Sequence, residues 1–308
     1  MKKKPIYFLV SFIVLVFATY AFLPHIIAKY HSYKSFKNLN LDVKNLKYEN
    51  DHIEYVEGGQ GETLVFVHGF QSTKNYWLPY FKRFHKKYNI VALDLPGHGN
   101  SSRPKDQKYD LQSITKSLEF FINEKDLKNF HLIGTSMGGG IATIYAHNNP
   151  DKVKSLVLIN PLGIDQKLKS DLQILMERGK NLLFPKNLEE FDEMAIFISG
   201  KPLALSAYFK KYALSQMIKN YFFFKRAFKE MITTTKTLDD ILPNIKTKSL
   251  LLIGQKDRII HPASYEYFVK LMPNAKAIRF KHAAHTFIGK YVNKATDSIE
   301  DFLKNPSN

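Results

Sequence analysis

Short apolar runs alternate with amphipathic stretches along most of the chain, starting near residue 53. Most of the apolar runs end at glycine, proline or aspartate, as buried strands often do. Strands are therefore predicted at 53–57, 64–67, 90–95, 130–134, 155–160, 248–257 and 275–280. Apolar residues at helical spacing predict helices at 77–85, 111–124, 138–147, 262–271 and 291–304. Because parallel strands covered on both faces are almost wholly apolar, the pattern predicts an α/β fold with a mostly parallel sheet.

The alternation breaks between residues 162 and 243, where no strand pattern occurs. This segment has helical stretches at 171–178 and 188–197, followed by an aromatic and basic stretch at 208–228. A loop of this length without structure would be uncommon in a compact domain, so a helical cap is predicted. The predicted parts are a first core segment at 47–161, the cap at 162–243 and a second core segment at 244–308.

The N-terminus carries an uncharged apolar run at residues 6–23, preceded by Lys2, Lys3 and Lys4. This run is just long enough to cross a bilayer as a helix. Two interpretations remain, a retained membrane anchor at residues 1–27 or a cleaved signal peptide. We favour the anchor, because the run is long for the core of a signal peptide. Residues 28–46 would then form a linker rich in lysine and aromatic residues.

Lysines flank the apolar run on both sides, so the positive-inside rule gives only a slight bias. The cluster at residues 2–4 favours a cytoplasmic N-terminus and an extracytoplasmic main domain. The whole chain of 308 residues has a formal net charge of +17. A lysine-rich coding bias explains this charge, and attraction to an anionic membrane surface is the alternative. No nucleic-acid recognition motif accompanies the charge. The chain lacks cysteine, which excludes disulfides and thiolate chemistry.

A serine lies between glycines directly after the predicted strand 130–134, in the sequence Gly134-Thr135-Ser136-Met137-Gly138. This G-x-S-x-G pattern between a strand and a helix is typical of a nucleophile elbow. The serine backbone must be strained there, so Gly134 and Gly138 keep side chains away from the turn. The sequence therefore predicts Ser136 as a nucleophile rather than part of a flexible turn.

A serine hydroxyl needs a base, and the base needs an acid that orients it. Asp257 ends the strand pattern at 248–257, and His285 lies in the loop after the strand at 275–280. The order serine, aspartate, histidine is the one expected for this type of elbow. His282 is the competing base, and Asp239 and Asp240 are competing acids at the end of the helical insert. We predict His285 as general base and acid, and Asp257 as the group that orients it.

The negative oxygen formed during acyl transfer needs hydrogen-bond donors. The backbone N–H of Met137, at the start of the helix after the serine, is one predicted donor. The other is the backbone N–H of Phe70, in the loop after the strand at 64–67. His68 and Asp94 are predicted to hold turns in place rather than to react.

These residues resemble the α/β-hydrolase superfamily, and the resemblance covers about residues 47–304. It rests on His68-Gly69-Phe70, the turn at 94–101, the elbow, Asp257 and His285. The branch that the chain resembles is that of membrane-anchored monoacylglycerol lipases. The resemblance implies an eight-stranded, mostly parallel sheet with helices on both faces, and hydrolysis of lipid monoesters without cofactor or metal. One departure is Ala284, because glycine usually precedes the histidine.

Two other functions stay open. Carbon–carbon-bond hydrolases of the same fold share the serine, aspartate and histidine, and a non-catalytic binding protein would keep the fold alone. Ser136 argues against the branches that use an aspartate nucleophile. The aromatic and basic stretch at 221–226 is expected either to dock on lipid headgroups or to pack the cap on the core. The sequence does not fix the acyl chain, the leaving group or the oligomeric state.

Overall fold

The computed structural model describes residues 23, 25–164, 168–234 and 236–304. Its centre is a sheet of eight strands in the order β1-β2-β4-β3-β5-β6-β7-β8. The strands are β1 (Asp42–Tyr48), β2 (Asp51–Gly58), β3 (Thr63–Val67), β4 (Asn89–Leu93), β5 (Phe130–Thr135), β6 (Val153–Ile159), β7 (Ser249–Gly254) and β8 (Ala275–Phe280). β2 pairs antiparallel with β1 and β4, and the other neighbours pair parallel. The predicted mostly parallel α/β sheet is confirmed.

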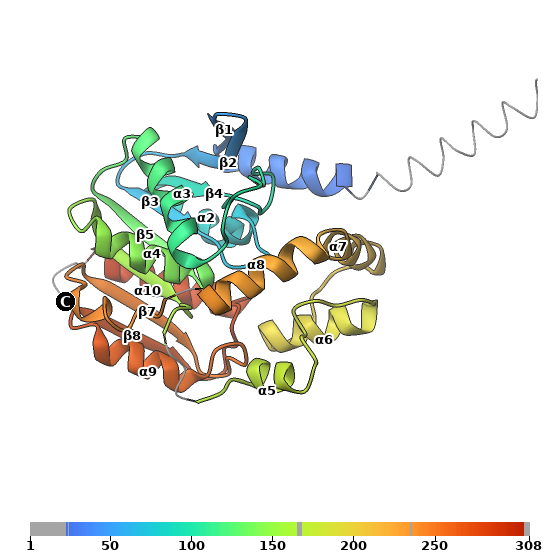
Figure 1. Ribbon diagram of the computed structural model, residues 1–308. Coiled ribbons are helices and arrows are strands. Elements are labelled where there is room, and N and C mark those ends of the chain that lie inside the picture. Colours follow the sequence, from blue (N-terminus) through green and yellow to red (C-terminus); the bar gives the residue numbers. More distant parts are fainter. Residues whose placement is uncertain (1–22, 24, 165–167, 235, 305–308) are drawn as a thin grey trace, which may run out of the picture.

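Helices cover both faces of this sheet (Figure 1). One face packs on α3 (Leu111–Glu124), α4 (Met137–Asn148) and α9 (Pro262–Leu271), and the other on α2 (Leu78–Phe84) and α10 (Lys290–Lys304). Side chains of a strand point alternately to the two faces. In β3, Val65 and Val67 therefore join the first hydrophobic core, while Leu64 and Phe66 join the second. This double burial explains why β3 is apolar at every position but its first.

The segment that we assigned to a linker contains regular structure. Residues 25–38 are helical, and β1 begins at Asp42. Phe36 of this helix is buried against the same face of the sheet as α2. The strand β1 did not stand out in the sequence because it is an edge strand, and all its side chains are at least partly exposed. Its pairing with β2, rather than an apolar run, makes it a strand.

The predicted membrane-spanning run at residues 6–23 lies almost wholly outside the described residues. Within the described part of the chain, no helix is both long and apolar enough to cross a bilayer. The anchor and its orientation therefore stay predictions.

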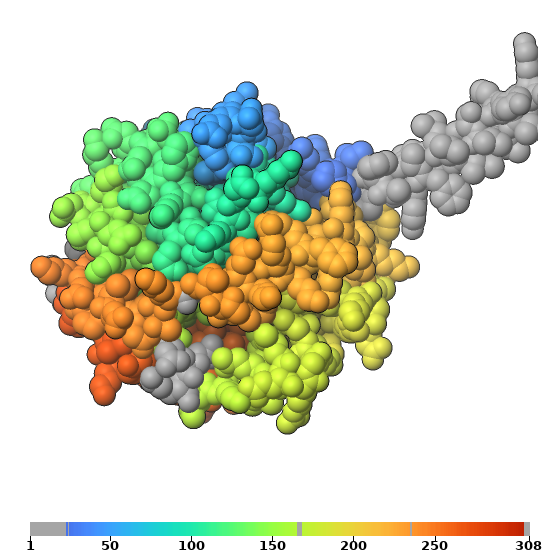
Figure 2. Space-filling view, viewed as in Figure 1, coloured from blue at the N-terminus to red at the C-terminus, as the bar shows by residue number. Residues whose placement is uncertain are grey.

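In the described part of the chain, four α-helices lie between β6 and β7. They are α5 (Asp171–Glu177), α6 (Leu188–Ser199), α7 (Ala207–Lys219) and α8 (Tyr221–Thr234). In Figure 2 this segment, yellow-green to orange, forms one side of the molecule next to the core. α5 and α8 line the cavity that opens at the carboxyl ends of the central strands. The strand pattern is absent from the described residues of this insert, as the sequence predicts.

The aromatic stretch at the start of α8 divides its side chains between two surroundings. The Phe223 ring lies edge-on to Tyr109 at 5.0 Å, and the Phe224 ring lies edge-on to Phe70 at 5.5 Å. Phe222, in contrast, is 84% exposed. Packing therefore explains Phe223 and Phe224, and Phe222 is left on the surface.

Candidate active site

Ser136 occupies a strained turn between β5 and α4. Its backbone angles are φ 52° and ψ −121°, a combination that residues with a side chain rarely adopt. The amide of Ser136 donates a 3.0 Å hydrogen bond to the Ile159 carbonyl at the end of the neighbouring β6. The turn thus places the serine side chain at the carboxyl end of the sheet, where parallel α/β folds bind ligands.

The glycines around Ser136 are required by close backbone approach. A Cβ atom added at Gly134 would lie 2.3 Å from the Gly138 carbonyl oxygen. A Cβ atom at Gly138 would lie 2.3 Å from the Val67 carbonyl oxygen. Neither contact is sterically possible, so the two glycines let α4 start tightly against β3 and β5. The sequence prediction for Gly134 and Gly138 thus has a concrete steric basis.

The structure brings Ser136, His285 and Asp257 into one hydrogen-bonded row. His285 Nε2 lies 2.9 Å from the Ser136 hydroxyl oxygen, and His285 Nδ1 lies 2.6 Å from Asp257 Oδ2. Asp257 follows β7 and His285 follows β8, so all three residues come from carboxyl ends of strands. Asp257 and His285 are both buried. A neutral His285 with its proton on Nδ1 can therefore accept the serine proton at Nε2.

The competing residues lie elsewhere. His282 is exposed, and the Ser136 hydroxyl contacts His285 instead, although only two residues separate the two histidines. Asp239 and Asp240 lie in the segment between α8 and β7, and Asp257 is the carboxylate that contacts His285. Position in the loop, rather than residue type, separates His285 from His282.

Asp257 is held by four donors. Its Oδ1 accepts hydrogen bonds from the amides of Ile259 at 2.8 Å and Ile260 at 3.1 Å. Its Oδ2 accepts from His285 and, at 2.5 Å, from the Tyr265 hydroxyl. Burial raises the pKa of Tyr265 well above its ordinary value, so this hydroxyl stays a donor. Both oxygens are saturated, which fixes the carboxylate orientation.

Tyr265 and Asn160 are site residues that the sequence alone does not reveal. The Asn160 side-chain amide donates to the backbone carbonyl of His285 at 2.7 Å and of Ala284 at 3.2 Å. Its side-chain oxygen accepts from the Gly254 amide at 2.8 Å. Asn160 therefore ties the end of β6 to the ends of β7 and β8. A polar residue at the end of an apolar strand is the one signal that marks it.

The alanine that replaces the usual glycine before His285 fits its position. Ala284 does not have a positive φ, unlike several other described residues, so its backbone suits an ordinary side chain. Ala284 is also buried. The departure from the family pattern therefore does not disturb the loop that carries His285.

The loop after β3 lies directly beside the serine. A Cβ atom built on Gly69 would lie 3.3 Å from the Ser136 Cβ and 3.8 Å from its hydroxyl oxygen. The next amide in this loop belongs to Phe70, and the Met137 amide begins α4. Within the described chain, neither amide donates to another backbone carbonyl. The two predicted oxyanion donors are thus unengaged and next to the nucleophile.

Two buried groups hold this loop. The Leu95 amide donates to His68 Nε2 at 3.0 Å, so His68 donates from Nδ1 to the Gly69 carbonyl at 2.8 Å. Asp94 binds the Lys74 amide at 2.7 Å and the Lys74 ammonium at 2.7 Å. His68 and Asp94 therefore hold turns in place, which is the role that the sequence predicts for them.

We expect the free energy of unfolding to fall as the pH drops from about 6.5 to about 5. Burial lowers the pKa of His68 to about 4 and that of His98 to about 3. In this window the unfolded chain binds protons at these histidines and the folded chain does not, so stability rises with pH. The loss is about 2 kcal/mol each for His68 and His98.

Urea denaturation at pH 7, 6 and 5 measures this loss. Carboxylates such as Glu300 become protonated only below this pH window, because lysine partners lower the pKa of Glu300 to about 2. His282→Gln changes an exposed histidine and should keep the wild-type slope. A free energy of unfolding that stays constant from pH 7 to pH 5 would refute the prediction.

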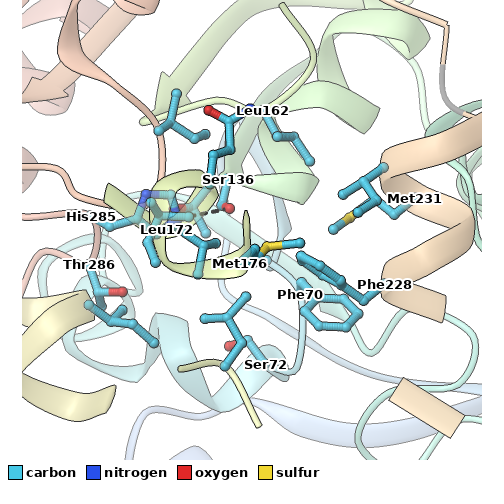
Figure 3. A pocket seen from close by; sticks show the side chains of 18 of the residues that line it. Phe70, Ser72, Ser136, Leu162, Leu172, Met176, Phe228, Met231, His285 and Thr286 are labelled. Carbon is cyan, nitrogen blue, oxygen red and sulfur yellow. Dashed lines mark hydrogen bonds between the residues drawn. The ribbon is translucent and has the colours of Figure 1, made fainter. Parts of the chain in front are cut away.

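The row of three residues opens into an apolar cavity of about 230 Å³. Figure 3 shows Ser136 and His285 on one side of it, with Phe70, Phe228 and Met231 on another. Its other apolar lining residues come mainly from α5 and from loops around the sheet: Leu162, Leu172, Met176, Leu183, Ile198, Ile232, Ile259 and Ile260. Within the described chain, no lysine or arginine lines it. This composition suits an acyl chain rather than an anion.

The sheet, the strained serine turn and the aligned histidine and aspartate define a hydrolase architecture of the α/β class. The chain belongs to the α/β hydrolase fold family, whose model matches residues 62–289. Monoacylglycerol lipase abhd6-B of Xenopus laevis is 25% identical over 279 residues, covering 86% of this chain and 83% of that protein. Lipase 1 of Psychrobacter immobilis is 28% identical over 269 residues, covering 85% and 84%.

A solved structure extends the similarity to nearly the whole chain. The crystal structure of a membrane phospholipase A, described as a bacterial virulence factor, superposes with a TM-score of 0.91. It is 28% identical in sequence, and the match covers 99% of each chain. The chain is therefore a lipase- or esterase-like α/β hydrolase with distant homology to monoacylglycerol lipases and bacterial lipases.

Proposed function

We propose that the protein hydrolyses carboxylic esters of lipids through an acyl-enzyme on Ser136. The single observation that carries this proposal is the hydrogen-bonded row from Asp257 through His285 to Ser136 at an apolar cavity. Two bonds at 2.6 and 2.9 Å connect a fixed carboxylate to a strained serine hydroxyl. A binding protein without catalysis would have no need of such a strained and aligned serine.

The geometry supports a two-step reaction. His285 Nε2 takes the Ser136 proton while the serine oxygen attacks the ester carbonyl, and the resulting oxyanion accepts from the amides of Phe70 and Met137. The carbon–oxygen bond then breaks, and His285 gives the proton to the leaving alcohol. A water molecule repeats the sequence on the acyl-enzyme and releases the fatty acid. Asp257 keeps the His285 proton on Nδ1 throughout and stabilises the imidazolium that forms.

We propose a lipid monoester, such as a monoacylglycerol, as the substrate. The apolar lining suits an acyl chain, and a volume of about 230 Å³ is small for a ligand pocket, where about 300–1,000 Å³ is usual. One chain is therefore favoured over two. The similarity to monoacylglycerol lipase of Xenopus laevis supports the same substrate class.

Carbon–carbon-bond hydrolysis is the competing reaction of the same fold. Its substrates are carboxylates, and a cation would be expected beside the serine to bind them. Within the described chain, the cavity at Ser136 has no lysine or arginine. Ester hydrolysis is therefore the better proposal.

We also propose that residues 1–27 attach the protein to a membrane, with the catalytic domain on the extracytoplasmic side. The described helix that continues from this segment supports attachment, because Ile26, Tyr30 and Tyr33 are all more than half exposed. Aromatic side chains on such a helix suit the interface of a bilayer.

A substrate panel tests the proposed reaction. We expect the purified protein to hydrolyse monoacylglycerols and p-nitrophenyl esters, with release of fatty acid, and to leave a ring-cleavage dienone unchanged. The apolar cavity provides the physical reason, because it offers no partner for the dienone carboxylates. Fatty-acid titration and dienone absorbance measure the two activities. Turnover restricted to the dienone would contradict the proposal.

A further inference from the structure

A second cavity, of about 500 Å³, lies on the helical insert next to the cavity at Ser136. The loop between α5 and α6 forms one side of it, and α8 forms the other. Met176, Phe228 and Ile232 line both cavities. The two spaces therefore adjoin along these three side chains.

Lysine dominates the rim of this second cavity. Lys180 and Lys186 come from the loop, and Lys225 and Lys229 come from α8. Glu190 is the one acidic residue among the described lining residues. The Lys180 ammonium is 2.8 Å from Glu193 and is thus neutralised. In the described part of the chain, the ammonium groups of Lys186, Lys225 and Lys229 have no ion pair with a carboxylate. We call these three the rim lysines.

Glu190 forms no ion pair with the rim lysines in the described part of the chain. One of its oxygens accepts from the Lys186 backbone amide at 2.8 Å, and the other accepts from the Asn187 side chain at 3.3 Å. Both contacts hold the first turn of α6, where a carboxylate also compensates the helix dipole. The carboxylate offsets at most one of the three charges of the rim lysines, so the rim of the cavity stays net positive.

Two of the rim lysines repel each other weakly along α8. Lys225 and Lys229 are four residues apart, so they lie on the same face of the helix. Like charges at this spacing repel each other. Lys186 faces the same cavity from the opposite side. An anion placed between these ammonium groups would relieve their repulsion and accept charge-assisted hydrogen bonds from both sides.

We propose that the rim lysines bind a phosphate group on the leaving alcohol of the lipid ester. This inference rests on the proposed ester hydrolysis and makes phosphate-bearing esters the preferred substrates among the proposed lipid monoesters. The acyl chain would lie in the apolar cavity with its carbonyl at Ser136. The alcohol would extend along Met176, Phe228 and Ile232 to the rim lysines. The distribution of charge suits such a substrate, because among the described residues one cavity has no lysine or arginine and its neighbour has four lysines.

A matched pair of soluble substrates tests this proposal. We expect the wild-type protein to have a higher kcat/KM for monohexanoyl glycerol phosphate than for monohexanoyl glycerol, both below their micelle concentrations. In the variant Lys186→Gln/Lys225→Gln/Lys229→Gln, the ratio of the two kcat/KM values should fall about tenfold, which is about 1.4 kcal/mol. The fall should come mainly from KM, because the phosphate contributes to binding in both ground and transition states.

The control variant is Lys211→Gln/Lys219→Gln/Lys246→Gln, which removes the same charge at exposed lysines outside the cavity. It should keep the wild-type ratio within about twofold, a loss of less than about 0.5 kcal/mol. A rim-lysine variant that also keeps the ratio would overturn the proposal. The same holds if only its binding to vesicles of anionic phospholipid weakens, since the lysines would then contact the bilayer rather than the substrate.

A direct binding measurement separates this proposal from the proposed reaction. Calorimetric titration with glycerol 3-phosphate should give heat with the wild type and the control, and none with the rim-lysine variant. If neither ester is hydrolysed but this pattern holds, the phosphate site stands and the proposed reaction fails. If both esters are hydrolysed and all three proteins titrate alike, the reaction stands and the phosphate site fails.

Discussion

Replacing Ser136 with alanine is expected to lower kcat for a monoacylglycerol by about 10⁶-fold. The hydroxyl oxygen is the atom that His285 contacts at 2.9 Å, and no other hydroxyl among the described lining residues has a hydrogen bond to His285. The backbone strain at φ 52° would persist, because alanine also carries a Cβ atom. The variant should therefore fold like the wild type and lose chemistry alone.

Labelling with a fluorophosphonate probe measures this effect most directly, because the probe forms a covalent bond with an activated serine. The wild type should label within minutes, and Ser136→Ala should not label at all. Ser72 lines the same cavity and provides the control, so Ser72→Ala should still label. If folded wild-type protein resisted the probe, or if Ser136→Ala labelled normally, the nucleophile would have been assigned wrongly.

Replacing Asp257 with asparagine is expected to lower kcat by about 10⁴-fold. The reason lies in the four donors around the carboxylate. The amides of Ile259 and Ile260 require an acceptor at the Oδ1 position, so the amide oxygen of the new asparagine must occupy it. Its NH₂ group would then face His285 Nδ1. The histidine would have to accept there and carry its proton on Nε2, where it can no longer act as a base.

The variant Tyr265→Phe is the matched control for this effect. It removes the 2.5 Å hydrogen bond to the same carboxylate oxygen but leaves the histidine with its acceptor. We expect a loss of about tenfold or less in kcat, in line with one hydrogen bond. Steady-state kinetics with a p-nitrophenyl ester compare the two variants, and circular dichroism verifies that both are folded. Equal losses in the two variants would show that Asp257 acts through general stability rather than through the histidine proton.

Much of the fold follows from local sequence pattern. The strand predicted at 275–280 and the helices at 111–124 and 262–271 have the observed bounds. In the two helices, the buried residues recur at helical spacing. The strand β1 was not predicted, because its side chains are at least partly exposed and form no apolar run. Its pairing with β2 is a contact that no local sequence pattern encodes. The stretch at 208–228 divides into α7 and α8 at Asn220, which caps the first of these helices.

The residues of the site also fall into two groups, those that the sequence predicts and those that it does not. Ser136, Asp257 and His285 could be found in the sequence, because each follows an apolar strand and the strained turn demands Gly134 and Gly138. Tyr265 and Asn160 could not be found, since Tyr265 reaches Asp257 from α9 and Asn160 reaches the His285 loop across 125 residues of chain. Their roles depend on distances between elements, which composition and periodicity do not contain.

The sequence by itself determined the α/β hydrolase architecture and the three residues of the hydrogen-bonded row, because strand burial and turn strain are local requirements that restrict residue types. Only the tertiary structure decided which atoms meet. Among the described residues, it placed a cavity without lysine or arginine at Ser136. A second cavity with the rim lysines adjoins it along Met176, Phe228 and Ile232. In the sequence these lysines are three among 45 basic residues. Packing the loop before α6 against α8 turns them into one positive rim, because charge acts through space rather than along the chain.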